Sequence, residues 1–379
     1  MFNAFFPCIR NRSLKQSHGK MVPEWLQRAE STYYLEKVLY ALETREQLRE
    51  EYRSASKPHD PNHSPSEQPE SPPDKTLTEF YSVSVGGNPV HRIFNRYMDV
   101  EPYDRTRLDP NGHYLNANWV RELHGGKWWI ATQAPLLNTA YTFLSVLLEQ
   151  VSPPGLPTSR ARVRTVVQLT RDVEGGRRKA HPYFPSATGP STVVREAQGQ
   201  GVSDRSFEVT LIEKKIIEGA HCTQSTVAVR DAAQGQSVIF NHLLYTAWPD
   251  HGVPEPGDHQ ALIDFLAQVE GVNRTQTSPG DDPDPPVMIN CSAGIGRTGT
   301  FIALSSLLRA YAPLQCALAP AQPQPPLPLS PLGLLPPEMS EDLIMQEIDS
   351  CREQRPGMVQ TDEQVVFLYR ILKKALASG

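Results

Sequence analysis

The chain has 379 residues, 39% of them apolar and 21% charged, which is enough for a sizeable hydrophobic core in one large domain or two small ones. This composition excludes a short peptide, a collagen-like chain and a wholly disordered chain. The 37 Lys and Arg against 42 Asp and Glu give a net charge of −5, which excludes a global positive field that would gather nucleic acid or an anionic membrane surface.

Neither a membrane span nor a disulfide framework is predicted. No stretch approaches the ~18 apolar residues that a span needs, and the first nine residues lack the basic region of a secretory signal, so a cytoplasmic protein is expected. The five cysteines are an odd, scattered set without a CxxC pair, which argues against disulfides and against a zinc site. At least one thiol is therefore a candidate for reactivity.

The N-terminal region divides into three parts. Residues 1–22 form a basic stretch without acidic side chains, which fits either a transit peptide or a solvated basic tail. Over residues 23–53 apolar side chains recur at helical spacing, and Arg45, Arg49 and their acidic neighbours are assigned mostly to the opposite face. This predicts an N-terminal helical cap of one amphipathic helix or two short ones. Residues 54–75 carry repeated prolines and no apolar period, so a disordered linker is expected.

The rest of the chain, residues 76–379, is predicted to form one large domain in which short β-branched runs mix with helical patterns. Strands are predicted over residues 164–169, 207–212, 226–229, 238–244 and 286–290. Helices are predicted over residues 141–150, 259–270, 298–311, 340–352 and 361–377. This mixture indicates an α/β fold around a mixed sheet.

A proline-rich insertion interrupts this domain. Residues 313–337 carry nine prolines between two predicted helices, so a flexible loop is expected there. The PxxP spacings Pro320–Pro323 and Pro328–Pro331 leave open a second interpretation, in which the segment binds an SH3-type partner.

The strongest chemical signal is Cys291, the only cysteine followed by an arginine six positions later. A predicted buried strand leads into Cys291, and Thr298 opens a predicted helix. Such a turn points successive backbone N–H groups into one concavity at the positive end of a helix, which suits a phosphate. The same environment favours the thiolate, so Cys291 is a candidate nucleophile. The candidate phosphate-binding residues are Ser292, Ala293, Gly294, Ile295 and Gly296.

Two more groups extend this site. Arg297 can donate to two phosphoryl oxygens at once, a geometry that lysine cannot match. Asp250 lies 41 residues before Cys291 in Trp248-Pro249-Asp250-His251-Gly252-Val253-Pro254, a loop bounded by proline and glycine that suits a lid. Because a tyrosyl leaving group has a pKa near ~10, its departure at neutral pH needs a proton donor, and Asp250 is the candidate.

These motifs closely resemble those of the protein tyrosine phosphatase family, in its tyrosine-specific, non-receptor, cysteine-dependent form. The resemblance covers roughly residues 80–377 and rests on the two loops above together with residues 95–99, 101–107, 114–118, 132–135 and 360–364. It implies a highly twisted mixed β-sheet flanked by helices on both faces, with residues 76–379 as the catalytic domain. It also implies hydrolysis of phosphotyrosine in proteins through a phosphocysteine intermediate.

The resemblance assigns roles to further residues. Tyr97 is expected to stack on the substrate ring, and Asp99 to accept a backbone N–H of the bound peptide, which favours phosphotyrosine over the shorter phosphoserine. Glu174 is expected to steer Arg297. Lys179 is expected to contact Asp250 or the phosphate. Gln360 and Gln364 are expected to orient a water molecule. The Thr298 hydroxyl is expected to stabilise the leaving thiolate. No metal or cofactor is implied, because arginine and amides neutralise the phosphoryl charge.

One departure from the family pattern touches the reaction centre. The residue before the nucleophile is usually histidine, and here it is Asn290, which can donate a hydrogen bond but carries no charge. A working enzyme is predicted, because every other chemical group is present. Two alternatives stay open: a phosphotyrosine-binding pseudophosphatase, and an adaptor whose proline-rich loop recruits SH3 partners.

Overall fold

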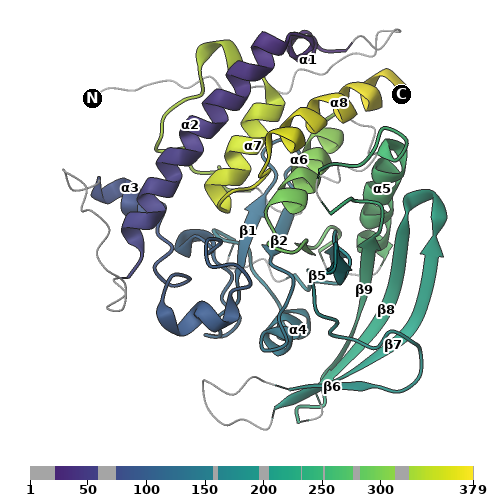
Figure 1. Cartoon of the computed structure of the whole chain (residues 1–379). Coiled ribbons are helices and arrows are strands. Elements are labelled where there is room, and N and C mark those ends of the chain that lie inside the picture. Colours follow the sequence, from purple (N-terminus) through teal and green to yellow (C-terminus); the bar gives the residue numbers. More distant parts are fainter. Residues whose placement is uncertain are drawn as a thin grey trace.

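The computed structural model describes residues 22–58, 74–156, 161–195, 205–231, 233–250, 252–275, 282–311 and 324–378 (Figure 1). The predicted basic tail lies outside these residues, except for Val22. Most of the predicted 54–75 linker lies outside them too. Within the described part of the chain, no helix is long and apolar enough to cross a membrane.

The centre of the fold is an eight-stranded mixed sheet in the order β1-β2-β10-β3-β9-β8-β7-β6. The four strands from β2 to β9 pair in parallel, and the pairs outside them are antiparallel. The strands are β1 (Ala117–Arg121), β2 (Trp128–Thr132), β3 (Thr165–Gln168), β6 (Thr192–Arg195), β7 (Ser206–Ile217), β8 (Cys222–Asp231), β9 (Ser237–Tyr245) and β10 (Val287–Asn290). All five predicted strands are confirmed, while β1, β2 and β6 were not among them.

Helices cover both faces of this sheet, which confirms the expected fold class (Figure 1). One face packs on α4 and the other on α5, α6, α7 and α8, with α2 beyond them. The helices are α1 (Glu24–Gln27), α2 (Thr32–Ser56), α3 (Lys75–Phe80), α4 (Ala140–Leu148), α5 (His259–Thr275), α6 (Gly296–Ala310), α7 (Leu343–Gln354) and α8 (Asp362–Ser378). Short 3-10 turns supplement them.

The N-terminal cap corrects one expectation. Of the one or two helices expected there, the long one, α2, begins after Ser31, whose side chain accepts a hydrogen bond from the Tyr34 N–H. Arg45 and Arg49 were assigned to the outer face, yet both are buried. The reason is that α7 presents Asp349, whose carboxylate accepts hydrogen bonds from both guanidinium groups. The buried face of α2 therefore begins with the apolar Val38 and Leu42 and continues with paired charges at Arg45 and Arg49.

The two segments expected to be irregular are shorter than predicted. Helix α2 continues to Ser56, so the first residues of the predicted linker are helical. Residues 324–337, the described part of the proline-rich insertion, are anchored rather than loose. Ser330 accepts a hydrogen bond from Arg45 and donates one to Glu353, and the Pro325 carbonyl accepts one from Arg121. Pro320–Pro323 lies outside the described residues, and the SH3 interpretation stays a prediction.

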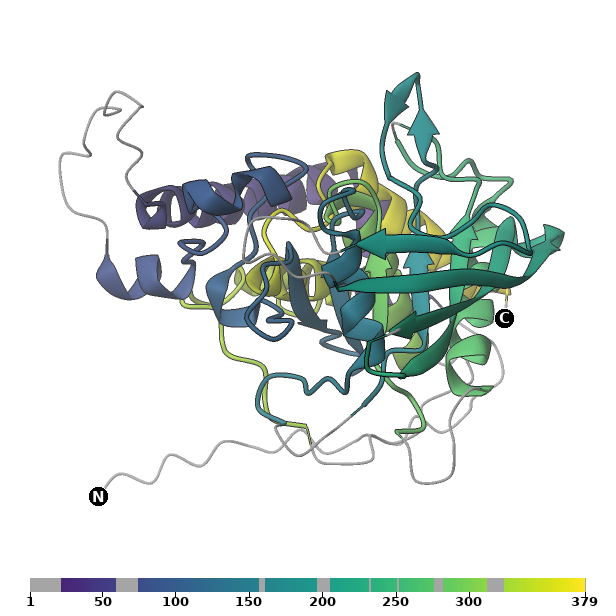
Figure 2. The ribbon, with the colours of Figure 1, turned by 90° about the horizontal axis from the view of Figure 1, so that it is seen from below.

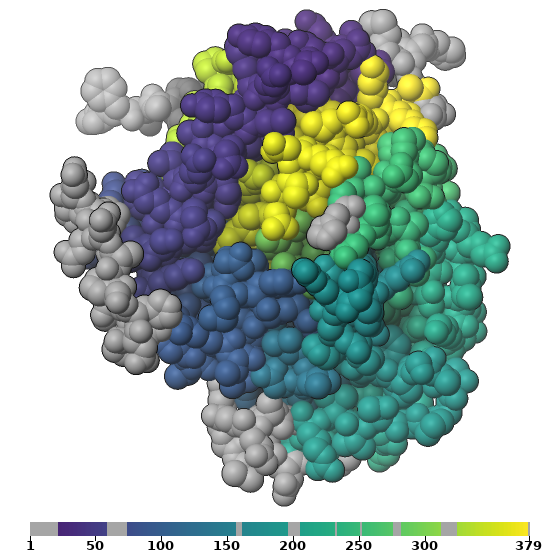
Figure 3. Space-filling model, viewed as in Figure 1, coloured from purple at the N-terminus to yellow at the C-terminus, as the bar shows by residue number. Residues whose placement is uncertain are grey.

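A separate two-stranded hairpin, β4 (Val173–Glu174) with β5 (Arg177–Arg178), stands out from the body of the molecule (Figure 2). In the space-filling view it reaches the surface near the middle of one face, beside the blue-coloured segment that follows α3 (Figure 3). The hairpin turns through Gly175 and Gly176, both at positive φ. The hairpin carries Glu174 on β4 and is followed directly by Lys179, and both residues belong to the candidate site.

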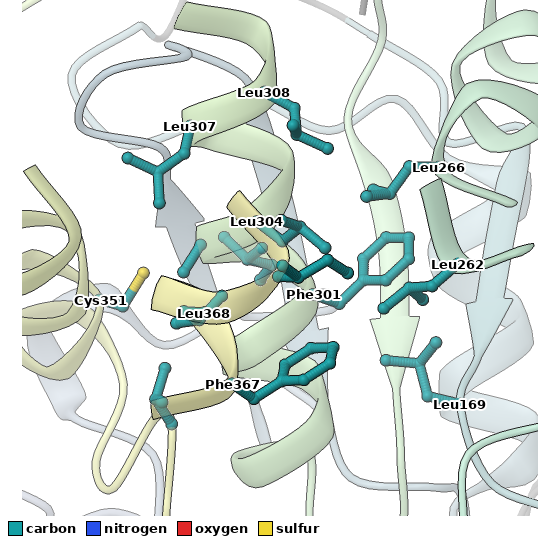
Figure 4. Close-up of a cluster of buried hydrophobic side chains, with 14 of the residues drawn as sticks. Leu169, Leu262, Leu266, Phe301, Leu304, Leu307, Leu308, Cys351, Phe367 and Leu368 are labelled. Atoms are coloured by element: carbon teal, nitrogen blue, oxygen red, sulfur yellow. The ribbon is translucent and has the colours of Figure 1, made fainter. Parts of the chain in front are cut away.

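The larger of the two main cores holds α6 in place behind the sheet. Phe301 and Leu304 of α6 lie between Leu262 of α5 and Phe367 of α8, and all four side chains are fully buried (Figure 4). Burial of four such side chains stabilises the fold by several kcal/mol, about 1.5–3 kcal/mol each. The packing fixes the N-terminus of α6, where the Cys291 loop ends.

Candidate active site

The loop from Cys291 to Gly296 connects the end of β10 to the start of α6. Gly294 has φ of +74°, and a Cβ atom there would lie 2.1 Å from the Thr132 carbonyl oxygen, so only glycine fits. Its N–H donates to the Cys291 sulfur at 3.3 Å. The predicted strand–loop–helix turn is therefore present, with a backbone amide aimed at the thiol.

The electrostatics of the loop favour the thiolate. Burial of Cys291 by itself raises the pKa of the thiol, because it disfavours the charged form. The Gly294 amide hydrogen bond, the nearby Thr298 hydroxyl and amide, and the charge of Arg297 together outweigh burial and lower the pKa below its ordinary value. Cys222 shows the opposite behaviour, since burial raises its pKa to about 12.

Arg297 is held in a fixed orientation by the β4–β5 hairpin. Its two terminal nitrogens, Nη1 and Nη2, each donate to one carboxylate oxygen of Glu174, both at 2.9 Å. Nη1 also donates to the Leu169 carbonyl oxygen at 3.0 Å. These contacts set the plane of the guanidinium group before any phosphate arrives.

Asp250 lies over the same site. Its Oδ1 atom is 2.8 Å from the Lys179 ammonium and 3.7 Å from Nη2 of Arg297, and its backbone carbonyl accepts from Arg297 at 3.0 Å. Trp248 is buried and donates from Nε1 to the Gly252 carbonyl oxygen at 3.2 Å. The loop is thus anchored by an apolar side chain at one end, with its carboxylate beside the arginine fork.

A tyrosine closes one side of the loop. The Ser292 hydroxyl donates to the Lys179 carbonyl oxygen at 2.8 Å and accepts from the Tyr97 hydroxyl at 2.8 Å. Met98 and Asp99, which follow Tyr97, are exposed. The segment expected to recognise phosphotyrosine therefore touches the candidate phosphate-binding loop directly.

Gln360 and Gln364 contact each other on the opposite side of the loop from Tyr97, beside Gly296. Gln364 accepts the Gln360 N–H at 2.9 Å through its side-chain oxygen. A Cβ atom at Gly296 would lie 3.0 Å from Gln364 Nε2 and 3.1 Å from Gln360 Oε1, so both amides border the N-terminus of α6. Among the described residues, no cluster of three or more His, Cys, Asp or Glu side chains is placed to hold a metal ion.

Comparison with known proteins agrees with this geometry. The family model described as protein-tyrosine phosphatase matches residues 91–318. The chain belongs to the protein-tyrosine phosphatase family. It is 30% identical over 296 residues to tyrosine-protein phosphatase non-receptor type 21 of Rattus norvegicus, covering 75% of this chain and 21% of that protein. It is 30% identical over 304 residues to non-receptor type 18 of Homo sapiens, covering 78% and 54%.

A receptor-type relative is similar to the same extent. The receptor-type tyrosine-protein phosphatase eta of Homo sapiens is 32% identical over 280 residues, covering 72% of this chain and 17% of that protein. The chain thus spans about half or less of the length of these relatives. The similarity describes the phosphatase domain that they share with it.

The departure at Asn290 is visible in the structure. Its side chain is fully buried, and Nδ2 donates to the Cys291 carbonyl oxygen at 3.1 Å. The Oδ1 atom has no hydrogen-bond partner among the described residues. Asn290 therefore donates a hydrogen bond to the backbone of Cys291 and contributes no charge.

Sequence reasoning missed Arg355, which is fully buried beneath the loop. Its guanidinium donates to the carbonyl oxygens of Ala293 and Gly294 at 3.0 and 2.8 Å and to the side chains of Asn116 and Asn118. These contacts turn the loop carbonyls away from the thiol and leave its amides to face inward. The asparagines were noted only as family core positions, and Arg355 carried no signal beyond a basic residue before a Pro-Gly turn.

Proposed function

We propose that this chain hydrolyses phosphotyrosine in proteins through a phosphocysteine intermediate, with Cys291 as the nucleophile. The observation that carries the proposal is the Cys291 thiol, whose pKa is lowered and whose sulfur accepts a hydrogen bond from the Gly294 amide. A pre-oriented Arg297 completes the binding groups for a phosphoryl dianion.

In the first step the Cys291 thiolate attacks phosphorus in line with the tyrosyl oxygen. The P–O bond breaks as the S–P bond forms, and Asp250 donates its proton to the departing oxygen. Arg297 and the loop amides bind the equatorial oxygens, where negative charge is spread in the transition state. The position of Asp250 beside Lys179 and Arg297 supports this role.

In the second step water attacks the phosphocysteine. Gln360 and Gln364 orient the water, and Asp250, now a carboxylate, accepts its proton. The S–P bond breaks, inorganic phosphate leaves, and the Thr298 hydroxyl stabilises the returning thiolate. The contact between the two glutamines at Gly296 supports a shared role for them.

Substrate selection follows from the depth of the site. The hydrogen bond between the Tyr97 and Ser292 hydroxyls places Tyr97 at one wall of the substrate site. The ring of phosphotyrosine can therefore stack on the Tyr97 ring while the phosphate group reaches the loop after Cys291. Phosphoserine is too short to span the same distance, and we expect it to bind poorly. Asp99 is exposed beside Tyr97 and is available to accept a backbone N–H of the bound peptide.

The test is turnover of p-nitrophenyl phosphate and of a phosphotyrosine peptide by the purified chain. We expect the wild-type chain to hydrolyse both and Cys291→Ser to hydrolyse neither. Cys222→Ala is the matched control, because Cys222 is buried and its raised pKa keeps it a thiol. If the wild-type chain binds the peptide and releases no phosphate, the chain is a pseudophosphatase and the proposal is wrong.

A further inference from the structure

Residues 324–331, which we call the proline ridge, belong to the proline-rich insertion and take no part in the proposed reaction. Four of these residues are proline, and three of the others directly precede a proline. Proline fixes φ near ~−65°, and the residue before a proline is restricted to extended conformations. Residues 324–330 are in neither a helix nor a strand. The ridge therefore favours the polyproline II conformation, which has about three residues per turn.

Every third side chain of the proline ridge is held against the body of the molecule. The side-chain oxygen of Gln324 accepts a hydrogen bond from the Trp128 indole at 2.8 Å. Leu327 is half-buried, although both of its neighbours in the chain are exposed. The Ser330 hydroxyl is hydrogen-bonded to side chains of α2 and α7. This spacing matches one turn of a polyproline II helix, so a single edge of the ridge is fixed to the fold.

The other edges of the ridge carry apolar side chains in solvent. Pro326, Pro328, Leu329 and Pro331 are all exposed, and the exposed fraction of Leu329 is 85%. Pro328 and Pro331 are three residues apart, so they lie on the same edge. A contiguous group of exposed apolar side chains is typical of a protein-interaction site.

The end of the ridge is also fixed. The Gly333 N–H donates to the Ser330 carbonyl oxygen at 3.1 Å, and Gly333 has φ of +82°, which closes a turn. Leu332, inside this turn, packs on Tyr81 and Tyr103. A segment that is ordered before it binds loses less conformational entropy on binding, so this anchoring favours a partner.

The ridge lies away from the candidate active site. Figure 2 shows the lime-green trace of this segment on the opposite side of the view from the β4–β5 hairpin, which carries Glu174. A partner bound to the ridge therefore leaves the Cys291 loop open to a substrate.

The charge of the segment limits the kind of partner. No Lys, Arg, His, Asp or Glu occurs in the sequence between Arg309 and Glu338. A groove with a charged specificity pocket would bury its charge against this segment without a partner, which costs free energy. An aromatic-lined groove needs no charge, because its rings pack directly on a polyproline II segment.

We propose that the proline ridge docks a partner domain that binds proline through an uncharged, aromatic-lined groove. Among domains that bind such segments, a WW-type domain with an uncharged groove fits this description. An SH3-type domain with an acidic pocket beside its groove does not. The proposal does not depend on the proposed function, and it replaces the general SH3 interpretation with a partner of defined groove chemistry.

The experiment measures binding of the purified full chain to a fluorescently labelled WW domain whose aromatic groove carries no charge. An SH3 domain with an acidic pocket is the comparison, and the readout is fluorescence anisotropy. We expect the WW domain to bind roughly 10-fold or more tightly than the SH3 domain. No binding of the WW domain up to about 1 mM, or tighter binding of the SH3 domain, would overturn the proposal.

Three variants locate the binding site. Pro328→Ala with Pro331→Ala should weaken WW binding by roughly 10-fold or more, because it truncates two side chains of the exposed edge. Ser330→Ala should weaken it by roughly 2- to 5-fold, since the partner must then order the segment itself. Pro336→Ala with Pro337→Ala is the matched control, because it removes two prolines beyond the ridge, and it should keep the wild-type affinity.

Two outcomes of this series would overturn the ridge. Equal losses in the two proline variants would show that binding does not select the exposed edge, and wild-type affinity in Ser330→Ala would contradict the role of the anchors. All three variants should keep wild-type turnover of p-nitrophenyl phosphate, because none of these residues belongs to the candidate active site. If the wild-type chain shows no turnover, the proposed function fails, while WW binding still tests the ridge, with circular dichroism to verify the fold.

Discussion

Glu174 and Arg297 face each other as two forks, with two nitrogens of the guanidinium each 2.9 Å from one carboxylate oxygen. Glu174 belongs to the β4–β5 hairpin and Arg297 to the first turn of α6, so 122 residues of chain separate two groups that act as one. Both side chains are nearly inaccessible, at 7% and 11% exposure. The same two nitrogens also donate to the Leu169 and Asp250 backbone carbonyl oxygens, so the orientation of the guanidinium group is fixed from three segments of the chain.

Loss of this fork should reduce turnover more than it reduces stability. We expect Glu174→Ala to lower kcat/KM for p-nitrophenyl phosphate on the order of 10- to 100-fold, because Arg297 must then be ordered by the substrate itself. Arg297→Lys should be at least as damaging, since a point charge cannot bind two oxygens in parallel. Steady-state kinetics check both. Wild-type kinetics in Glu174→Ala would show that the loop alone orients Arg297.

Asn290 gives a prediction about pH. Attack requires the thiolate, so the acid limb of kcat/KM follows the pKa of Cys291. Asn290 donates only a neutral hydrogen bond, and a protonated histidine there would add positive charge that favours the thiolate. We expect Asn290→His to shift the acid limb, and the pH profile of iodoacetate alkylation, to lower pH. Superimposable alkylation profiles would mean that Thr298, Gly294 and Arg297 set the thiol acidity without help from residue 290.

The turn of the β4–β5 hairpin at Gly175 should restrict the position of the Asp250 carboxylate, the proposed proton donor. A Cβ atom at Gly175 would lie 2.7 Å from Oδ2 of Asp250, so Gly175→Ala forces that carboxylate to move. Gly176 is the matched control, because its φ is also positive and nothing lies within 4 Å of its Cβ position. We expect roughly 10-fold lower kcat for Gly175→Ala than for Gly176→Ala, since displaced catalytic groups lose orientation. Equal kcat values in the two variants would contradict this role.

The sequence was sufficient for the parts of the fold whose signal is local. The strands β3 and β10 are short runs built on Val166-Val167 and Val287-Met288-Ile289, and the loop after Cys291 carries its glycines and its arginine in fixed order. The strands β1 and β2 include polar and aromatic residues that are buried only because β10 and the helices cover them, so no local pattern revealed them. Arg355 was missed for a related reason, because its partners come from two distant segments, Asn116–Asn118 and Ala293–Gly294.

The N-terminal helix α2 also shows that a local sequence pattern cannot predict which charged side chains are buried. The helical period predicted α2, but charge alone assigned its arginines to solvent. Only the placement of α7 shows that Asp349 and Glu353 receive them. Tertiary pairing decides such positions, and periodicity cannot anticipate it.

Stability should depend strongly on that buried network. Arg49 is fully buried and donates to Asp349 and Glu353 at 2.5 and 2.6 Å. We expect Arg49→Met to lower the free energy of unfolding by about 3–5 kcal/mol, because the buried carboxylates of Asp349 and Glu353 each lose a charged partner. Arg28→Met, which breaks the exposed pair with Glu341, should cost under about 1 kcal/mol. Urea denaturation compares them, and similar losses in the two variants would contradict the prediction.

The same network predicts a pH dependence. Burial raises the pKa of Asp349, but the charge of Arg49 and the contacts of Arg45 outweigh it and hold this pKa below its usual value. A carboxyl whose pKa is lower in the folded state adds stability above its unfolded value, near ~3.9, and loses it as the pH falls through the folded value. We expect this acid-side decline to be smaller in Arg49→Met. Denaturation midpoints measured from pH 6 down to pH 3 check the sign.

The most direct test of the account is detection of the phosphoenzyme. Rapid mixing with a phosphotyrosine peptide, acid quenching and mass spectrometry should locate one phosphate on Cys291. The signal should grow in Gln360→Ala, because the water that clears the intermediate is then less well oriented. Release of inorganic phosphate at the wild-type rate with no phosphate on Cys291, or with phosphate on another side chain, would contradict the central claim.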